Sequence, residues 1–79
     1  MKYVVNVGFG NFVNRERVVA IVNPDSSPIR KLKNELMEQG RVIDATQGKR
    51  TRSILIMDSG HIILSGIAVE TIAERMNSE

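Results

Sequence analysis

The spacing of apolar and polar residues along the 79-residue chain predicts short strands and two helices. Tyr3 to Val7 and Arg17 to Val22 are rich in β-branched residues and too short for helices, which is typical of strands. The second run is apolar at successive positions, so we expect a strand that is buried on both faces. Gly8-Phe9-Gly10-Asn11 predicts a turn, and the residues after Asn11 again resemble a strand.

Two segments have the apolar spacing of helices. Ser26 or Ser27 can cap the first, and Pro28 suits its first turn because the amide it lacks would be unpaired there. Gly40 supplies a left-handed residue at its C-terminus. The apolar positions of this helix are Ile29, Leu32, Leu36 and Met37. Those of the second are Val69, Ile72, Ala73 and Met76.

Three more strands are predicted, over Arg41 to Ala45, Arg52 to Met57 and His61 to Ser65, the last antiparallel to the one before it. A loop over Thr46 to Arg50 and a turn at Asp58-Ser59-Gly60 separate them. The order ββαβββα predicts an α+β fold in a single domain, residues 1–79, with a mixed or mainly antiparallel sheet and two helices packed against it. The strands carry more apolar surface than two short helices cover, so we expect a homo-oligomer.

Composition excludes several function classes. The chain has no cysteine, which removes disulfides, thiolate nucleophiles and cysteine-held metals. His61 is the single histidine, and we expect it to be half-buried and hydrogen-bonded, while Asp44 and Asp58 bond to turn amides. We therefore predict no metal site, no cofactor and no catalytic residue. No apolar run is long enough for a membrane span and no signal peptide is recognisable, so a cytoplasmic location is expected.

Charge is distributed unevenly, although the net charge is only +2. Residues 30–52 hold seven basic and three acidic residues, whereas residues 70–79 hold one basic and three acidic. Lys49-Arg50-Thr51-Arg52 places three cations on a loop, where binding groups usually lie. In an extended segment Arg50 and Arg52 project to one side, and Lys49 and Thr51 to the other, so two guanidiniums can contact adjacent phosphates.

Three function classes remain open from the residues alone. The basic loop can bind nucleic acid, or it can dock the acidic segment 70–79 of a neighbouring subunit or another acidic partner. A nucleotide- or phosphate-binding subunit rests on Gly8-Phe9-Gly10, where the third glycine of a dinucleotide fingerprint is missing. Base stacking is disfavoured, because the aromatic residues Tyr3, Phe9 and Phe12 lie near the N-terminus and away from the basic loop.

Four motifs stand in a characteristic order: Asn6 to Asn11, Arg17 with its apolar strand, Ser27-Pro28, and the block from Ile43 to Arg52. This order resembles the RemA family of bacterial extracellular-matrix regulators, over nearly the whole chain. The resemblance implies a DNA-binding transcriptional regulator, located at the nucleoid, that forms a closed ring-like homo-oligomer and activates biofilm-matrix and osmoprotection operons. It implies no catalytic activity, no membrane and no small-molecule substrate.

The resemblance also assigns roles to residues. Arg50 and Arg52 correspond to the family's DNA-contacting arginines, and Thr51 can add a hydroxyl to a phosphate. Lys49 stands where an arginine is usual, which keeps the charge but loses the bidentate fork. Arg17 matches a position important for activity and is a further candidate DNA-binding residue, although an arginine that opens a buried strand can instead hold a subunit interface. Pro28 also matches a position important for activity, and we expect it, with Gly8, Gly10 and Asn11, to be structural or to serve assembly. Gln47 stands where the family often carries an aromatic residue.

A ring would repeat the loop cations many times. About two phosphate contacts per subunit over three or four subunits give roughly six to eight contacts, enough to weaken binding about 10³- to 10⁵-fold between 50 and 200 mM salt. With no helix suited to the major groove and no aromatic wedge, we expect the protein to recognise double-stranded DNA by backbone spacing and by the bendability of A·T-rich sequence.

Overall fold

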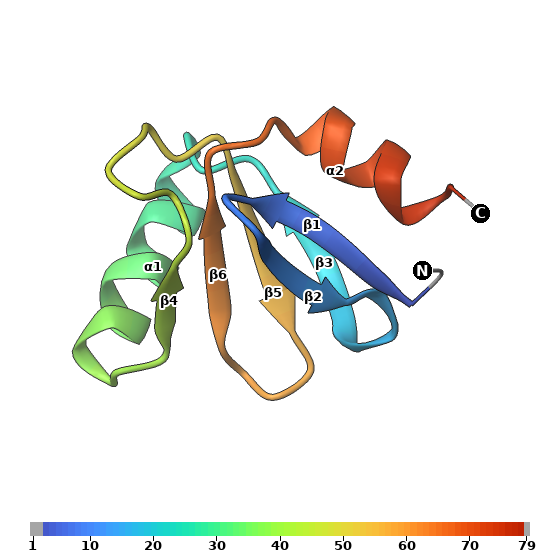
Figure 1. The fold of residues 1–79 in the computed structure, drawn as a ribbon. Coiled ribbons are helices and arrows are strands. Elements are labelled where there is room, and N and C mark those ends of the chain that lie inside the picture. The colour runs from blue at the N-terminus through green and yellow to red at the C-terminus, as the bar shows by residue number, and fades with distance from the viewer. Residues whose placement is uncertain (1–2, 79) are drawn as a thin grey trace.

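The computed structural model describes residues 3–78, which contain six strands and two α-helices (Figure 1). The elements are β1 (Val4–Gly8), β2 (Asn11–Asn14), the short 3-10 helix η1 (Arg15–Arg17), β3 (Val18–Val22), α1 (Ser27–Glu38), β4 (Val42–Asp44), β5 (Ser53–Met57), β6 (Ile62–Ser65) and α2 (Val69–Met76). The strands pair mainly antiparallel, which confirms the predicted α+β class. Neither helix within residues 3–78 has the length and apolar character that crossing a membrane requires.

The structure has one strand more than the predicted order. β2 pairs antiparallel with β1 as a separate two-stranded sheet, in which Val5 lies opposite Val13 and both are buried. Only two of the four residues of β2 are apolar, so its sequence carries little periodicity. The predicted turn at Gly8 to Asn11 is confirmed, and it makes this pair a hairpin.

The other four strands form a sheet in the order β3-β5-β6-β4. β5 and β6 pair antiparallel across the turn after Met57, as predicted, and β3 joins the outer side of β5. β4 pairs parallel with β6, in the register Val42 to Ile62. Because β5 and β6 are antiparallel and joined by a short turn, the chain enters β5 and leaves β6 at the same end of the sheet.

Two apolar clusters hold the layers together. On one face of the four-stranded sheet, Leu55 and Ile63 pack against the β1–β2 hairpin and α2, whose Ile72 is fully buried. On the other face, Ile54, Ile62 and Leu64 pack against apolar residues of α1. The sheet therefore lies between α1 and a layer made by the hairpin and α2 (Figure 1).

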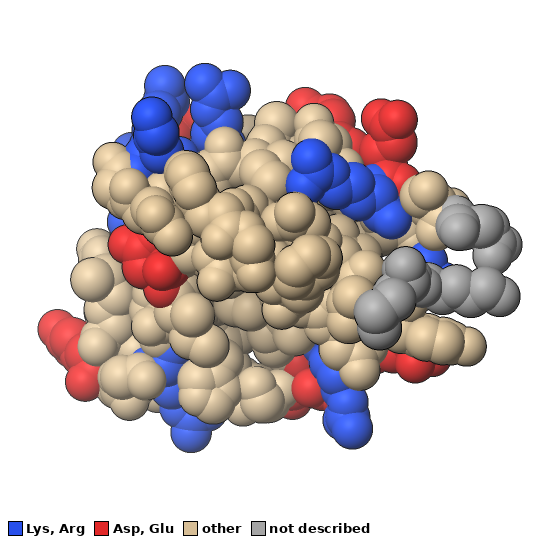
Figure 2. Space-filling view, viewed as in Figure 1, with Lys and Arg blue, Asp and Glu red and all other residues tan. Residues whose placement is uncertain are grey.

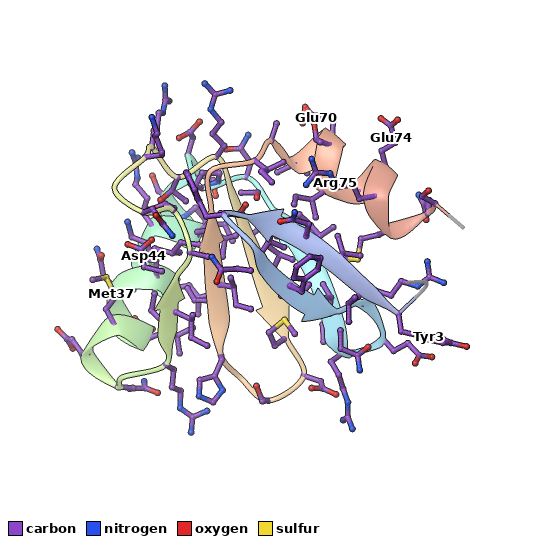
Figure 3. All side chains as sticks on the ribbon, viewed as in Figure 1. Tyr3, Met37, Asp44, Glu70, Glu74 and Arg75 are labelled. Atoms are coloured by element: carbon purple, nitrogen blue, oxygen red, sulfur yellow. The ribbon has the colours of Figure 1, made fainter. Side chains whose placement is uncertain are left out.

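The expectation that the Arg17 to Val22 strand is buried on both faces is wrong. β3 begins at Val18 and is an edge strand, and a bulge in its pairing leaves Val19 67% exposed. An unbroken apolar run indicates that a strand is suited to burial, but it does not show which elements will cover it. Here α1 packs mainly on β4, at the other edge of the sheet, and leaves β3 partly uncovered. Met37, predicted on the apolar face of α1, is also exposed, and it projects from the helix in Figure 3.

The predicted helix signals are otherwise confirmed. Ser26 rather than Ser27 is the N-cap, and its Oγ accepts a hydrogen bond from the Ile29 amide at 3.4 Å. Pro28 lies in the first turn of α1, and Gly40 adopts a positive φ of 71° beyond its C-terminus. These caps fix where α1 begins and ends, and so where the chain turns back into β4.

Candidate nucleic-acid interface

The basic loop, Lys49–Arg52, is held by backbone hydrogen bonds on both sides. The Lys49 amide donates to Thr46 O at 3.0 Å, and the Arg52 amide donates to Ser65 O at 2.8 Å. Between Thr46 and Lys49, Gln47 and Gly48 have φ of 50° and 82°, the two positive values that a type I′ turn requires. The three cations therefore project from a fixed backbone.

Asp44 organises the entry to this loop. Its Oδ1 accepts from the Thr46 hydroxyl at 2.6 Å and from the Thr46 amide at 2.9 Å, which is the turn-bonding role predicted from the sequence. These two hydrogen bonds hold the pKa of the Asp44 carboxyl below its usual value, with a smaller contribution from the charge of Lys33. Thr46 itself is buried, so the loop starts from an ordered residue.

Replacing Asp44 with alanine is expected to lower the free energy of unfolding at neutral pH by about 1 kcal/mol, because the Asp44 side chain is exposed and its two hydrogen bonds to Thr46 are only partly buried. A carboxyl whose pKa is lowered by folding stabilises the protein above its unfolded pKa and loses that effect as pH falls through the folded value. The difference between wild type and Asp44→Ala should therefore shrink below about pH 4 in urea titrations. The exposed Glu35→Ala is the control, and a constant difference across that range would contradict the role of the carboxylate.

The tip of the β1–β2 hairpin is a two-residue turn. Phe9 and Gly10 have φ of 54° and 77°, again the signs of a type I′ turn, in which asparagine, aspartate or glycine is preferred at the first position. A bulky residue in this region costs about 1–3 kcal/mol and is usually held by its surroundings. Here the Gly8 amide donates to Asn6 Oδ1 at 2.7 Å, and Asn11 Nδ2 donates to Gly8 O at 3.0 Å. The Gly8 amide is thus engaged within the turn instead of facing outward toward a phosphate.

Ser65 joins the hairpin to the basic loop. Its backbone carbonyl accepts the Arg52 amide, and its buried hydroxyl donates to Val7 O at 2.7 Å and accepts from the Ile67 amide at 3.1 Å. Ser53 lies directly across from Ser65 in the β5–β6 register, and its hydroxyl is buried without a hydrogen-bond partner among the described residues. The end of β6 therefore fixes the two segments relative to each other.

The hairpin tip and the basic loop form the walls of an open groove of about 510 Å³. The groove is lined by Gly8, Phe9, Lys49, Arg50, Arg52, Gly66 and Ile67. The expectation that the aromatic residues lie away from the basic loop is therefore wrong for Phe9, whose side chain is 53% exposed. The hairpin folds back over the sheet, which brings its tip to the end where β5 begins (Figure 1).

A second, shallower depression of about 320 Å³ lies on the other side of the loop. Arg50 and Arg52 line both depressions, whereas Lys49 lines only the one with Phe9 and Thr51 only the second. Lys49 and Thr51 were expected to project to the same side of the extended loop, but they line different depressions. Two carboxylates, Asp25 and Glu70, also line the second depression.

The loop cations are not neutralised by neighbouring carboxylates. Within residues 3–78 the one ion pair is Arg17 with Asp58, at 3.1 Å, and no carboxylate lies within 4.0 Å of the charged groups of Lys49, Arg50 or Arg52. Figure 2 shows Lys and Arg side chains gathered at the end of the molecule where the β4–β5 loop lies in Figure 1. Glu70 and Glu74 project outward from α2 in Figure 3.

Arg17 is not part of this arrangement. It precedes β3 and pairs with Asp58 after β5, so it lies at the opposite end of the sheet from Arg52. Pro28 likewise lies in α1 and does not line either depression. The structure thus brings Lys49–Arg52 together with Gly8 and leaves Arg17 and Pro28 elsewhere.

Other polar residues have structural roles. Arg15 Nη1 donates to Met76 O at 2.9 Å and so holds the C-terminus of α2 against the turn before β3, and Arg75 Nη1 donates to Asn6 O at 2.8 Å. Half-buried His61 lies with its Nδ1 2.9 Å from Ser59 Oγ, as expected for a hydrogen-bonded imidazole. In the part of the chain that the structure describes, no three histidine or carboxylate side chains are placed to share a metal ion.

Comparison with known proteins identifies similar chains. The sequence model for "RemA-like: Extracellular matrix regulatory protein A-like" matches residues 4–76. A protein of Oleidesulfovibrio alaskensis is 60% identical over 75 residues, which cover 95% of this chain and 89% of the relative. A protein of Nitratidesulfovibrio vulgaris is 59% identical over 75 residues, which cover 95% of this chain and 85% of the relative. A Pseudothermotoga lettingae protein is 58% identical over 71 residues, which cover 90% of this chain and 78% of the relative. All three carry the name "Putative regulatory protein".

Proposed function

Because this chain belongs to the RemA-like family of extracellular matrix regulatory proteins, we propose that it regulates transcription by binding double-stranded DNA. The observation that supports this best is the basic loop, where three cations without carboxylate partners in residues 3–78 extend from an anchored backbone. DNA phosphates supply the missing charge, and arginine forks can contact them in pairs. Its relatives are named for regulation and not for a reaction, and no catalytic step is proposed.

The proposal includes assembly, because three cations on one chain of net charge +2 make a weak DNA ligand. A ring-like homo-oligomer would repeat Lys49, Arg50, Thr51 and Arg52 along a DNA backbone. Exposed apolar side chains and the free edges of β3 and β4 support subunit contacts. The exposed apolar residues are Tyr3, Phe9, Phe12, Val19, Met37 and Ile43.

The proposed targets are bendable, A·T-rich promoter regions, bound by a protein that acts at the nucleoid. By resemblance to the family, these promoters would control biofilm-matrix and osmoprotection operons. Backbone contacts fix the position of DNA on a ring, and the energy of bending selects the sequence. Arg17 and Pro28, which lie away from the loop, would serve activity through contacts between subunits.

The test is fluorescence anisotropy of an A·T-rich duplex titrated with the purified protein at several salt concentrations, with the oligomer mass measured by light scattering. We expect cooperative binding by a multimer, and an affinity that falls about 10³- to 10⁵-fold between 50 and 200 mM salt if six to eight phosphates are contacted. A wild-type protein that binds no duplex at 50 mM salt, where backbone contacts are strongest, would refute the proposal.

A second candidate function is a protein-interaction module whose basic loop docks an acidic segment. It is favoured by the position of Glu70, which lines a depression with Arg50 and Arg52 without pairing to either. In this reading the loop of one subunit would contact α2 of the next, and removing a loop arginine would break the assembly. The two functions therefore predict different effects of changing Glu70.

If DNA is the ligand, Glu70→Gln is expected to strengthen binding about two- to threefold per engaged subunit, because it removes a negative charge within roughly a Debye length, about 8 Å, of the phosphates. The oligomer mass should not change. Glu74→Gln is the matched control, since it removes the same charge from α2 but does not line the depression. A smaller assembly in Glu70→Gln, with no gain in DNA affinity, would favour the docking function instead.

A further inference from the structure

The groove between the hairpin tip and the basic loop combines an aromatic ring with a cluster of cations. One wall carries the exposed ring of Phe9, and the other carries Lys49, Arg50 and Arg52. Ile67 and two glycines complete the apolar part of the lining. A nucleotide presents the same pair of chemistries, an apolar base face and an anionic phosphate.

Phe9 is held outward by its backbone. Glycines flank it on both sides, so no neighbouring side chain shields the ring, and its φ of 54° is one that phenylalanine rarely adopts. The tip is fixed by the hydrogen bonds of Asn6 and Asn11. It also lies close to the Ile67 side chain: a Cβ added to Gly8 would lie 3.6 Å from Ile67 Cδ1. A rare conformation on an anchored turn is typical of a functional position.

The relation between ring and cations is also fixed. Ser65 bonds through its carbonyl to the Arg52 amide and through its hydroxyl to Val7 O, two residues before Phe9. The backbone segments that carry the ring and the guanidiniums therefore meet a ligand in a fixed relation, with little loop ordering left to occur on binding.

We propose that Phe9 is an apolar wedge that contacts a flexible base step of duplex DNA while Arg50 and Arg52 hold the neighbouring phosphates. This inference rests on the proposed function and adds to it a residue that selects where the DNA deforms. Apolar side chains that enter a base step unstack it and bend the duplex, and pyrimidine–purine steps such as TA open most easily. Repeated around a ring, such wedges would favour DNA with flexible steps at the subunit spacing.

The experiment compares two labelled duplexes of equal length and composition, one with TA steps and one with stiff A-tracts, in anisotropy and in an end-to-end energy-transfer assay of bending. Phe9→Gly and Phe9→Asn remove the ring and suit a positive φ, so both should fold and keep the wild-type melting temperature or raise it. Phe9→Tyr keeps the ring. Gln47→Gly is the matched control, because it relieves the other non-glycine positive φ in residues 3–78 without removing an aromatic group.

We expect wild type, Phe9→Tyr and Gln47→Gly to prefer the TA duplex and to bend it. Phe9→Gly and Phe9→Asn should bind the TA duplex at least about tenfold more weakly and bend it less, since loss of an aromatic contact to a base has an effect of that size. The slope of the logarithm of their binding constant against the logarithm of salt concentration should change by less than about one unit, because the phosphate contacts remain. Equal binding and bending by wild type and Phe9→Gly would overturn this inference alone, whereas a wild type that binds neither duplex would overturn the proposed function with it.

Discussion

Replacing Arg50 and Arg52 together with alanine is expected to eliminate measurable duplex binding at 150 mM salt. Both side chains line both depressions around the basic loop, and no described carboxylate competes for them. If three or four subunits engage DNA at once, the double substitution removes about six to eight phosphate contacts, and each contact contributes roughly 0.9 to the salt slope. Anisotropy at low salt, where residual binding is detectable, should show a slope reduced by about five or more.

Charge-matched controls separate the loop from a general loss of positive charge. Lys31→Ala with Arg41→Ala removes two exposed cations, one on α1 and one near the β5–β6 turn, and should change affinity only slightly. Arg50→Lys with Arg52→Lys keeps the charge but loses the bidentate fork, so it should retain the slope and weaken binding moderately. If alanine at both positions instead dissociates the oligomer, the loop is a subunit contact. A loss confined to one promoter sequence would contradict recognition through the backbone.

The local features of this fold could be predicted because they depend on residues that are close together in the sequence. The helices follow from apolar spacing bounded by Ser26, Pro28 and Gly40, and the β5–β6 hairpin follows from two branched runs around Asp58-Ser59-Gly60. The loop cations could be identified for the same reason. Each of these signals lies within a short stretch of sequence, where pattern and structure correspond directly.

What the sequence did not reveal depends on which elements become neighbours. The apolar run of β3 is compatible with a central or an edge strand, and only the pairing order decides between them. The position of Phe9 in the groove could not be predicted, because Phe9 and Lys49 lie far apart in sequence and come together only when the hairpin folds over the sheet. A usable signal was present in Gly8-Phe9-Gly10, since glycine on both sides of an aromatic residue suits an exposed ring on a tight turn.

The largest effect on stability is expected from Leu55→Ala. Leu55 has no exposed surface and lies at the centre of the sheet, between Ile21 of β3 and Ile63 of β6, under the hairpin and α2. Truncating such a leucine costs about 3–5 kcal/mol, which is comparable with the whole net stability that a core of this size usually supplies. Circular dichroism should show a melting temperature at least about 10 °C lower, or no folded state at all.

Met37→Ala is the matched control, because it removes a side chain of similar volume that is 56% exposed on α1, and its effect should stay within about 1 kcal/mol. Protein concentration supplies a second test, since assembly stabilises the folded chain by mass action. If Leu55→Ala recovers structure at high concentration, subunit contacts compensate for the weakened core. If it melts like the wild type at every concentration, the packing of the hairpin and α2 on β5 does not hold the fold together, and the rigid link between Phe9 and the basic loop loses its basis.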